Sequence, residues 1–140
     1  MKKLFIAAFM FVSSFGANVM ADGHAIKMGI ILGFTGPIES LTPAMAGSAE
    51  LAFKEASDSG SLLGGKKIEV IRADSTCVDS AAATAAAEGV ISQGVAAIMG
   101  ADCSGVTGAI ASNVAVPNGC LLYTSPSPRD ATLSRMPSSA

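Results

Sequence analysis

The sequence predicts an α/β fold in which a parallel sheet is covered by helices on both faces. Short, β-branched apolar runs bounded by glycine alternate three times with longer segments of helical periodicity. Each connection between successive strands is long enough to hold a helix, as a parallel crossover requires. Half of the residues are hydrophobic and 14% are charged, a composition too apolar for a disordered chain.

The first predicted strand covers residues 26–33, IKMGIILG, which are short, β-branched and closed by glycine, like a strand buried on both faces. A loop from Phe34 to Leu41 follows. Thr42 and Pro43 then supply an N-cap and a favourable first helical residue. We expect the helix to run to about residue 59. Its apolar side chains recur at helical spacing: Met45, Ala49, Ala52, Phe53 and Ala56.

The remaining elements repeat this alternation. A second strand is predicted over residues 67–73, and Asp79 is predicted to cap an alanine-rich helix that ends at Ser92. That helix should direct Ala82, Ala86, Val90 and Ile91 to one side. A third strand is predicted over residues 95–99, followed by a third helix with Val106, Ile110 and Val114 on its apolar face. A fourth strand should begin directly after Gly119.

Residues 1–21 are predicted to be a secretory signal peptide. Lys2 and Lys3 precede an apolar run, and Val19 and Ala21 are the small residues that signal peptidase requires. A membrane anchor would need roughly 20 unbroken apolar residues, and this run is shorter and interrupted. We therefore expect cleavage after Ala21 and release of a soluble protein into an oxidising compartment.

The charge of the predicted mature segment limits its partners. Residues 22–119 contain ten acidic and five basic residues, a net charge of −5. An acidic balance of this kind argues against nucleic acid or an anionic membrane surface as the partner.

Motifs for catalysis are weak. Residues 60–67, GSLLGGKK, nearly match a phosphate-binding loop, but Lys67 replaces the metal-binding hydroxyl and the segment leads from a helix into a strand, so we interpret it as a turn. The only histidine is His24, close to the predicted mature N-terminus. No cluster of metal-ligating residues appears. The sequence predicts no enzyme, metal site or cofactor.

Two cysteines lie at one edge of the predicted sheet. Cys77 and Cys103 each follow the C-terminal end of a strand, and in a secreted chain a disulfide is the natural interpretation, with two free thiols as the alternative. Cys120 is left as an odd third cysteine.

The strongest candidate site is the segment DCSGVTG, residues 102–108, where the third helix begins. Backbone N–H groups and the positive end of the helix dipole favour an anion there, and Ser104 and Thr107 add hydroxyl groups. The alternative is that Ser104 merely caps its helix.

The segments IKMGIILGFTGPIES, GSAELAFKEASDSG, ADSTCVDS and MGADCSGVTGAIAS resemble the leucine/isoleucine/valine-binding proteins of bacterial ABC transporters, which are periplasmic binding proteins of the first structural type. The resemblance runs from about residue 26 to residue 119. It implies a two-lobed fold that closes on its ligand, of which residues 22–119 are part of the first lobe.

This resemblance also implies roles for particular residues. Cys77 and Cys103 match the family's disulfide, and Ser104 matches the serine that binds the amino acid's carboxylate. Thr107 matches a further hydroxyl position. Leu41 stands roughly where an aromatic residue lines the side-chain pocket. The implied function is capture of a branched-chain amino acid and delivery to a membrane ABC permease, by a protein that is a monomer when full length.

Two other classes of function are also compatible with this sequence. One is a secreted α/β enzyme that uses the Ser104 turn as an anion site. The other is the ligand-sensing domain of a receptor. A histidine or carboxylate matched to Ser104 would favour the enzyme, and a transmembrane segment after a second lobe would favour the receptor.

The C-terminal segment CLLYTSPSPRD, from residue 120, is unlike the rest. A DNA sequence that encodes residues 120–130 resembles a transposase-type sequencing adapter, and the same reading frame gives the adapter's far end at residues 134–140. We therefore interpret residues 120–140 as adapter read-through rather than native sequence. A Ser/Pro tail should also leave the edge of the third strand uncovered.

Overall fold

The computed structural model describes residues 25–124, without the side chain of Leu63. One four-stranded sheet has the order β2-β1-β3-β4, and all its strands are parallel. The elements are β1 (Ile26–Leu32), α1 (Thr42–Asp58), a 3₁₀ turn (Leu62–Gly64), β2 (Ile68–Asp74), α2 (Ser80–Ser92), β3 (Ala97–Gly100), α3 (Ser104–Ile110), a π-helical turn (Ala111–Ala115) and β4 (Leu121–Tyr123).

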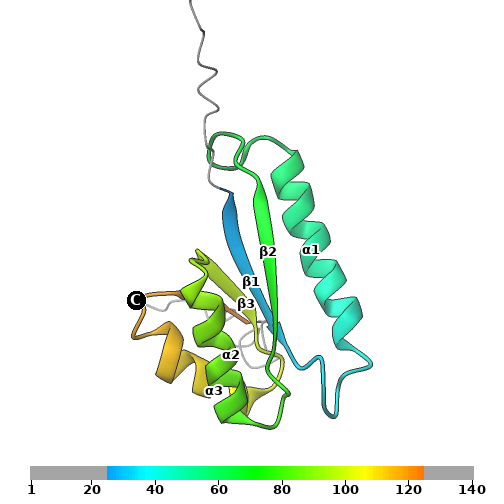
Figure 1. Cartoon of the computed structure of the whole chain (residues 1–140). Coiled ribbons are helices and arrows are strands. Elements are labelled where there is room, and N and C mark those ends of the chain that lie inside the picture. Colours follow the sequence, from blue (N-terminus) through cyan, green and yellow to red (C-terminus); the bar gives the residue numbers. More distant parts are fainter. Residues whose placement is uncertain (1–24, 125–140) are drawn as a thin grey trace, which may run out of the picture.

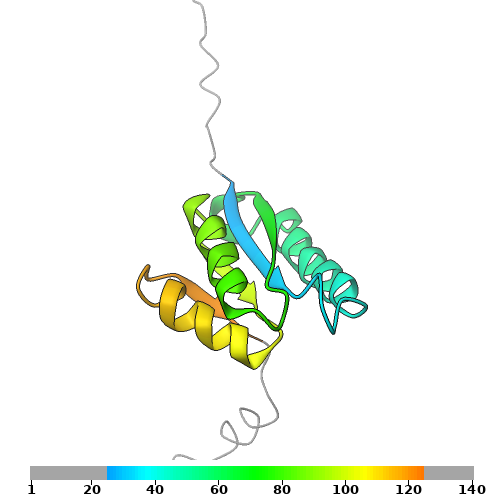
Figure 2. The same ribbon diagram turned by 60° about the horizontal axis from the view of Figure 1, so that its bottom comes forward.

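Helices cover both faces of the sheet, as predicted. Helix α1 lies on one face, and α2 and α3 lie on the other (Figures 1 and 2). Strand β1 is central, and its residues alternate between the two sides. Ile31 contacts the α2 and α3 side, whereas Ile30 and Leu32 contact the α1 side. The α/β fold class is therefore confirmed.

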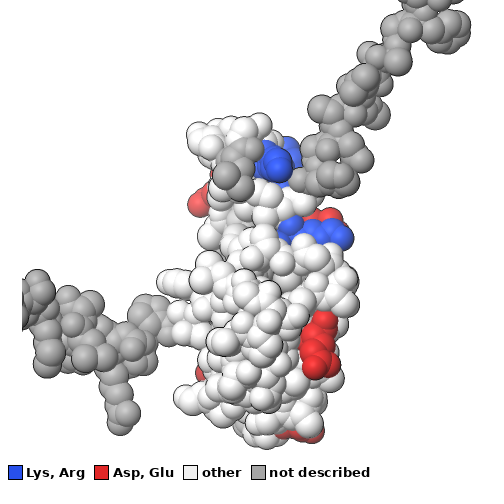
Figure 3. All heavy atoms as spheres, turned by 90° about the vertical axis from the view of Figure 1, so that its left-hand side faces the viewer, with Lys and Arg blue, Asp and Glu red and all other residues white. Residues whose placement is uncertain are grey.

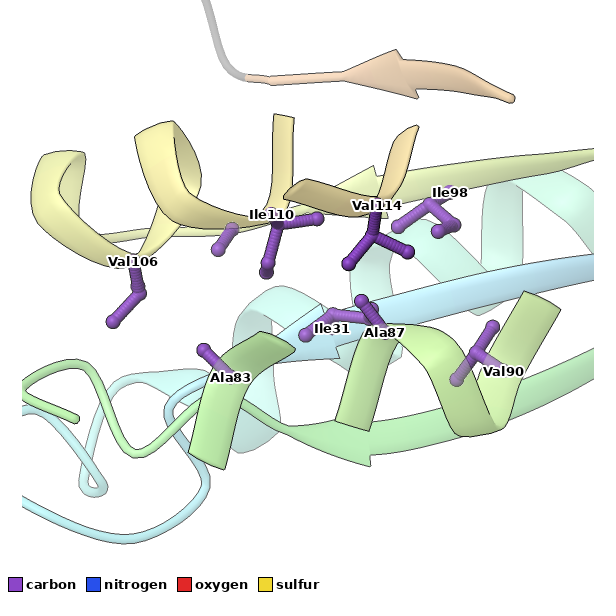
Figure 4. Packing of buried hydrophobic residues seen from close by; sticks show 9 residues of the cluster. Ile31, Ala83, Ala87, Val90, Ile98, Val106, Ile110 and Val114 are labelled. Atoms are coloured by element: carbon purple, nitrogen blue, oxygen red, sulfur yellow. The ribbon is translucent and has the colours of Figure 1, made fainter. Parts of the chain in front are cut away.

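The larger cluster of buried residues lies between the sheet, α2 and α3 (Figure 4). Val106, Ile110 and Val114 point from α3 and the π-helical turn toward α2, and all three are buried, as the sequence predicts. Ala83 and Ala87 of α2 face them. Burying an aliphatic side chain of this size contributes roughly 1.5 to 3 kcal/mol, so this cluster is the main source of stability on this face.

The predicted buried face of α2 is correct at Val90 and Ile91 but wrong by one residue in the first half of the helix. Ala83, Ala87 and Val90 are buried, whereas the prediction placed Ala82 and Ala86 on that side. The reason is that alanine occupies nearly every position in the first half of α2, so hydrophobic periodicity does not fix the helix's rotation. The predicted ends of α2 are correct. Asp79 is the N-cap and accepts hydrogen bonds from the backbone N–H groups of Ala81 and Ala82.

Helix α1 begins one residue differently from the prediction. Leu41 is the N-cap, and Thr42 is the first helical residue. The Thr42 side chain is fully buried, and its hydroxyl donates to the carbonyl of Glu39 at 3.2 Å. It therefore stabilises the preceding turn instead of capping the helix.

Residues 121–123 form a strand, contrary to the expectation that the tail would leave the edge of β3 uncovered. Leu121, Leu122 and Tyr123 pair in parallel with Ala97, Ile98 and Met99. The physical reason is local, because Leu-Leu-Tyr has good strand propensity and the first proline of the tail comes only at Pro126. This segment occupies the place where a fourth strand was predicted.

An apolar hollow of about 390 Å³ lies between α1 and the β3–β4 side of the sheet. We call it the α1 groove. Its lining residues are Met28, Ala49, Ala52, Phe53, Ala97, Ile98, Met99, Leu121 and Tyr123. The predicted apolar face of α1 is thus only partly covered.

Candidate functional site

The carboxyl ends of the parallel strands meet at one edge of the sheet, at the lower end of the molecule in Figure 1. Three segments leave this edge. They are the loop from Gly33 to Leu41 after β1, the turn from Ser75 to Asp79 after β2, and the short connection from Ala101 to Cys103 that leads into α3. Edges of this kind are the usual ligand sites of open α/β sheets.

Ser104 is the first residue of α3, and its side chain is exposed. Cys103 is the N-cap and makes no capping hydrogen bond. Ser104 therefore does not cap the helix, which removes the alternative raised from the sequence. No hydrogen bond to the Ser104 hydroxyl is found within residues 25–124, so this group is available to a ligand.

Thr107 uses its hydroxyl proton inside the helix. Its Oγ1 donates to the carbonyl oxygen of Cys103 at 2.9 Å. The same carbonyl accepts the backbone N–H of Thr107, also at 2.9 Å. In this conformation Thr107 can offer a ligand only the lone pairs of its hydroxyl oxygen, which suit a donor such as an ammonium group better than a carboxylate.

Leu41 is placed at the end of the first loop, where it is 60% exposed. Its backbone N–H donates to the carbonyl of Ile38 at 2.9 Å, and its own carbonyl accepts from Met45 at 3.3 Å. The backbone at Leu41 is therefore fixed while its apolar side chain faces solvent.

Cys77 and Cys103 are joined by a disulfide, so the structure contains the predicted pair. The bond links the turn after β2 to the start of α3 across 26 residues of sequence. Loop entropy gives such a cross-link a stabilising effect of about 3 to 4 kcal/mol. Cys77 and Thr76 both have positive φ, 68° and 57°, conformations that non-glycine residues adopt only at a cost of roughly 1 to 3 kcal/mol each.

Asp74, the last residue of β2, holds both neighbouring loops. Its carboxylate accepts the hydroxyl of Thr35 at 2.6 Å, the backbone N–H of Thr35 at 3.3 Å, and the backbone N–H of Thr76 at 2.8 Å. Burial raises the pKa of this carboxyl. Hydrogen bonds from the Thr35 side chain and from the backbone of Thr76, Thr35 and Phe34 outweigh burial, so the pKa lies below its ordinary value.

The hydrogen bonds of Asp74 make the stability of the fold depend on pH. Because its pKa is lower in the folded protein than in the unfolded chain, its charge stabilises the fold above the ordinary aspartate pKa of about 3.9, and this contribution is lost as the pH falls through the lower folded-state value. We expect the difference in unfolding free energy between the full-length natural protein and its Asp74→Ala variant to be constant from pH 7 to about pH 5 and to shrink below about pH 4. Urea unfolding across this range measures it, and a difference that persists unchanged to pH 3 would contradict the assignment.

Asp102 makes a second link between the loops. Its Oδ2 accepts the backbone N–H of the buried Gly33 at 2.8 Å, and its Oδ1 lies 3.5 Å from the hydroxyl of the fully buried Ser75. Neither Asp74 nor Asp102 was assigned a role from the sequence. The available signal was an acidic residue at the carboxyl end of a buried strand, but its partners lie 39 and 69 residues away and are set by the fold.

Residues 25–124 contain neither a metal site nor a membrane-spanning helix. No group of histidine, cysteine and acidic side chains is arranged to hold a metal ion there. No helix of this part of the chain is long and apolar enough to cross a membrane.

A parallel sheet with an exposed hydroxyl and linked loops at its carboxyl edge is typical of α/β proteins that bind small ligands. Residues 25–137 match the family model of the periplasmic binding proteins, and the chain belongs to this family. The match extends across the segment that the sequence led us to interpret as non-native. Members are binding proteins rather than enzymes, and the family implies a location outside the cytoplasm.

Solved structures support the same conclusion. The chain is 30% identical to the branched-chain amino acid transporter substrate binding protein LivJ from Streptococcus pneumoniae in complex with isoleucine, with a TM-score of 0.63 over 71% of this chain and 28% of that one. It is 27% identical to an ABC-type branched-chain amino acid transporter from Rhodopseudomonas palustris, with a TM-score of 0.63 over 73% of this chain and 27% of that one. A second ABC transporter structure from Rhodopseudomonas palustris is 28% identical, with a TM-score of 0.60 over 74% of this chain and 30% of that one.

These structures confirm the fold of the first structural type of periplasmic binding protein, and the chain spans just over a quarter of their length. A search of curated protein sequences found no significant match.

Proposed function

We propose that the chain is the amino-terminal part of a periplasmic protein that captures a branched-chain amino acid and delivers it to an ABC permease. The observation that carries this proposal is the exposed Ser104, which does not cap its helix and lies at the carboxyl edge of the sheet. The chain that forms this sheet belongs to the periplasmic binding proteins. The isoleucine complex of the similar Streptococcus pneumoniae protein supports an aliphatic amino acid as the ligand.

Each site residue has a proposed role. Ser104 donates its hydroxyl to the ligand's carboxylate. Leu41, exposed at the end of the first loop, contacts the ligand's side chain, and Thr107 offers its hydroxyl oxygen at the second turn of α3. An isolated edge of this kind covers only one side of a ligand, so the rest of the natural protein supplies the opposing surface. Closure of the two lobes on the ligand then shifts an open–closed equilibrium and involves no chemical step.

The boundaries of this protein are also proposals. Residues 1–21 act as a signal peptide that is removed after Ala21, and the natural sequence continues after Gly119 with residues other than those at 120–140. The mature protein is a monomer. Residues 1–24 and 125–140 lie outside the described part of the chain, so sequencing an independent copy of the gene is the direct test of the C-terminal boundary.

Replacing Ser104 with alanine in the full-length natural protein tests the binding role. Hydrogen bonds to a charged group contribute about 1.5 to 3 kcal/mol, so we expect the affinity for leucine in calorimetry to fall roughly tenfold to a hundredfold. The thermal unfolding midpoint should change little, because Ser104 is exposed and caps nothing.

Ser80→Ala is the matched control. Ser80 is the first residue of α2, as Ser104 is of α3, and it too is exposed. We expect this variant to bind leucine like the unmodified protein. Equal affinities for all three proteins would show that Ser104 does not contact the ligand.

A further inference from the structure

The first four residues of the loop after β1 are each held by a different contact. Gly33 donates its backbone N–H to Asp102, and Thr35 is bound by Asp74. The ring of Phe34 lies under the guanidinium of Arg72, whose carbon is 5.6 Å from the ring centre. A side chain at Gly36 could not be accommodated, because its Cβ would lie 2.5 Å from the carbonyl oxygen of Thr76. The path of the loop toward Leu41 is therefore fixed at its origin.

Asp102 belongs to a different part of the fold from the residues that make these other contacts. Arg72, Asp74 and Thr76 all belong to β2 or to the turn after it, so they fix the loop relative to β2. Asp102 lies between β3 and α3, two residues before Ser104. Its hydrogen bond to Gly33 is thus a direct link between the first loop and the segment that begins α3.

The Gly33–Asp102 bond is hard to replace. The Gly33 residue is buried, and a buried backbone N–H that loses its partner destabilises the conformation that buries it. Asp102 is half-buried, and its second oxygen lies 3.5 Å from the buried hydroxyl of Ser75, so each carboxylate oxygen has a partner in a neighbouring loop. Loss of the carboxylate would release the start of the loop from β3 and leave its contacts to β2 in place.

We propose that Asp102 is a positioning residue that sets the distance between the carboxylate anchor at Ser104 and the side-chain wall at Leu41, and thereby sets the length of ligand side chain that the protein prefers. This inference rests on the proposed function, in which those two residues contact opposite ends of the amino acid. The affinity of a ligand that contacts both Ser104 and Leu41 is sensitive to a change in the distance between these two residues. A ligand with a short side chain reaches only the anchor and is much less sensitive.

The test compares the affinities of the full-length natural protein and its Asp102→Ala variant for leucine and for alanine. We expect the variant to lose about tenfold more affinity for leucine than for alanine, which general destabilisation would not produce. Asp102→Asn keeps an oxygen that can accept the Gly33 N–H and should restore most of the preference for leucine.

Asp79→Ala is the matched control. The Asp79 carboxylate also accepts two groups, the backbone N–H of Ala81 at 2.8 Å and that of Ala82 at 3.0 Å, but it caps α2, and within residues 25–124 it has no hydrogen bond to the first loop. This variant should lose a comparable amount of thermal stability and keep its preference for leucine. Equal losses of leucine and alanine affinity in Asp102→Ala, or the same change of preference in Asp79→Ala, would overturn the inference.

Hydrogen exchange of the unliganded protein separates this inference from the proposed function. In Asp102→Ala the backbone amide of Gly33 should exchange at least tenfold faster than in the unmodified protein, while the Thr35 amide, bonded to Asp74, and the amides of α2 keep their rates. Unchanged exchange at Gly33 would overturn the inference whatever the protein binds. Faster exchange there, in a protein that binds neither leucine nor alanine, would overturn the proposed function and support the Asp102 link.

Discussion

Replacing Gly100 with alanine is expected to prevent the protein from folding. Gly100 is the last residue of β3, pairs with Ile31 of β1, and has φ of +128°, a region of backbone conformation that side chains strongly disfavour. An added Cβ would lie 1.9 Å from the carbonyl oxygen of Ile31, and no flexible side chain is present there to move aside. The two central strands would have to separate.

The cost of that separation is large compared with the stability of a domain. Typical domains are stable by about 5 to 15 kcal/mol, and separating β1 from β3 would disturb the buried cluster around Ile31 as well as the ladder. We expect the Gly100→Ala form of the full-length natural protein to be recovered only as aggregate, or to show no cooperative unfolding transition by circular dichroism.

Gly89→Ala is the control for this substitution. Gly89 lies inside α2, and apart from the neighbouring backbone of that helix no atom lies within 4 Å of an added Cβ. Alanine there should raise the unfolding free energy by up to about 1 kcal/mol, because glycine is the poorer helix former. A Gly100→Ala protein that unfolds at the same temperature as the unmodified protein would show that β3 does not hold this backbone conformation.

Elements with a strong local signal could be predicted from the sequence. The cap at Asp79 and the spacing of Val106, Ile110 and Val114 are local patterns, and the structure confirms them. The rotation of α2 was predicted wrongly because a run of alanines does not distinguish one side of a helix from another. The N-cap of α1 was predicted wrongly because the Thr42 hydroxyl donates to the carbonyl of Glu39 instead of capping the helix.

The candidate site was predictable only in part. Ser104 could be placed at a strand's carboxyl end because a glycine-bounded apolar run precedes it. The roles of Asp74 and Asp102 depend on which loops the strand order β2-β1-β3-β4 brings together, and no periodicity in the sequence specifies that order. A fourth strand was predicted directly after Gly119, and residues 121–123 lie where it was expected. The expectation that the tail would leave the edge of β3 uncovered is wrong, because Leu-Leu-Tyr precedes the prolines of the tail.

The 140-residue chain made by itself is expected to self-associate and to bind no leucine. The α1 groove is apolar along its length, and Leu121 and Tyr123 at its border are 67% and 62% exposed. Strand β4 is an edge of the four-stranded sheet and can pair with another chain. Few charged side chains lie on the face seen in Figure 3 to oppose association.

Binding should fail for a separate reason. The chain spans 28% of the Streptococcus pneumoniae protein that it resembles, and in the proposed function the surface opposite Ser104 comes from residues that this chain lacks. Ligand contacts on one side alone leave most of an amino acid in water, and a small ligand needs a concave site that buries most of its surface.

Size-exclusion chromatography with light scattering, together with leucine calorimetry, measures both effects on residues 22–140. We expect oligomers at micromolar concentration and no saturable heat. Leu121→Lys should reduce the oligomers, because a charge at the border of the groove and on the edge strand opposes both modes of association. It should not restore binding, since it adds no surface over the ligand. A monomer with a cooperative transition and saturable leucine binding would show instead that residues 22–140 form a complete site, and would contradict both the proposed second lobe and the non-native origin of residues 120–140.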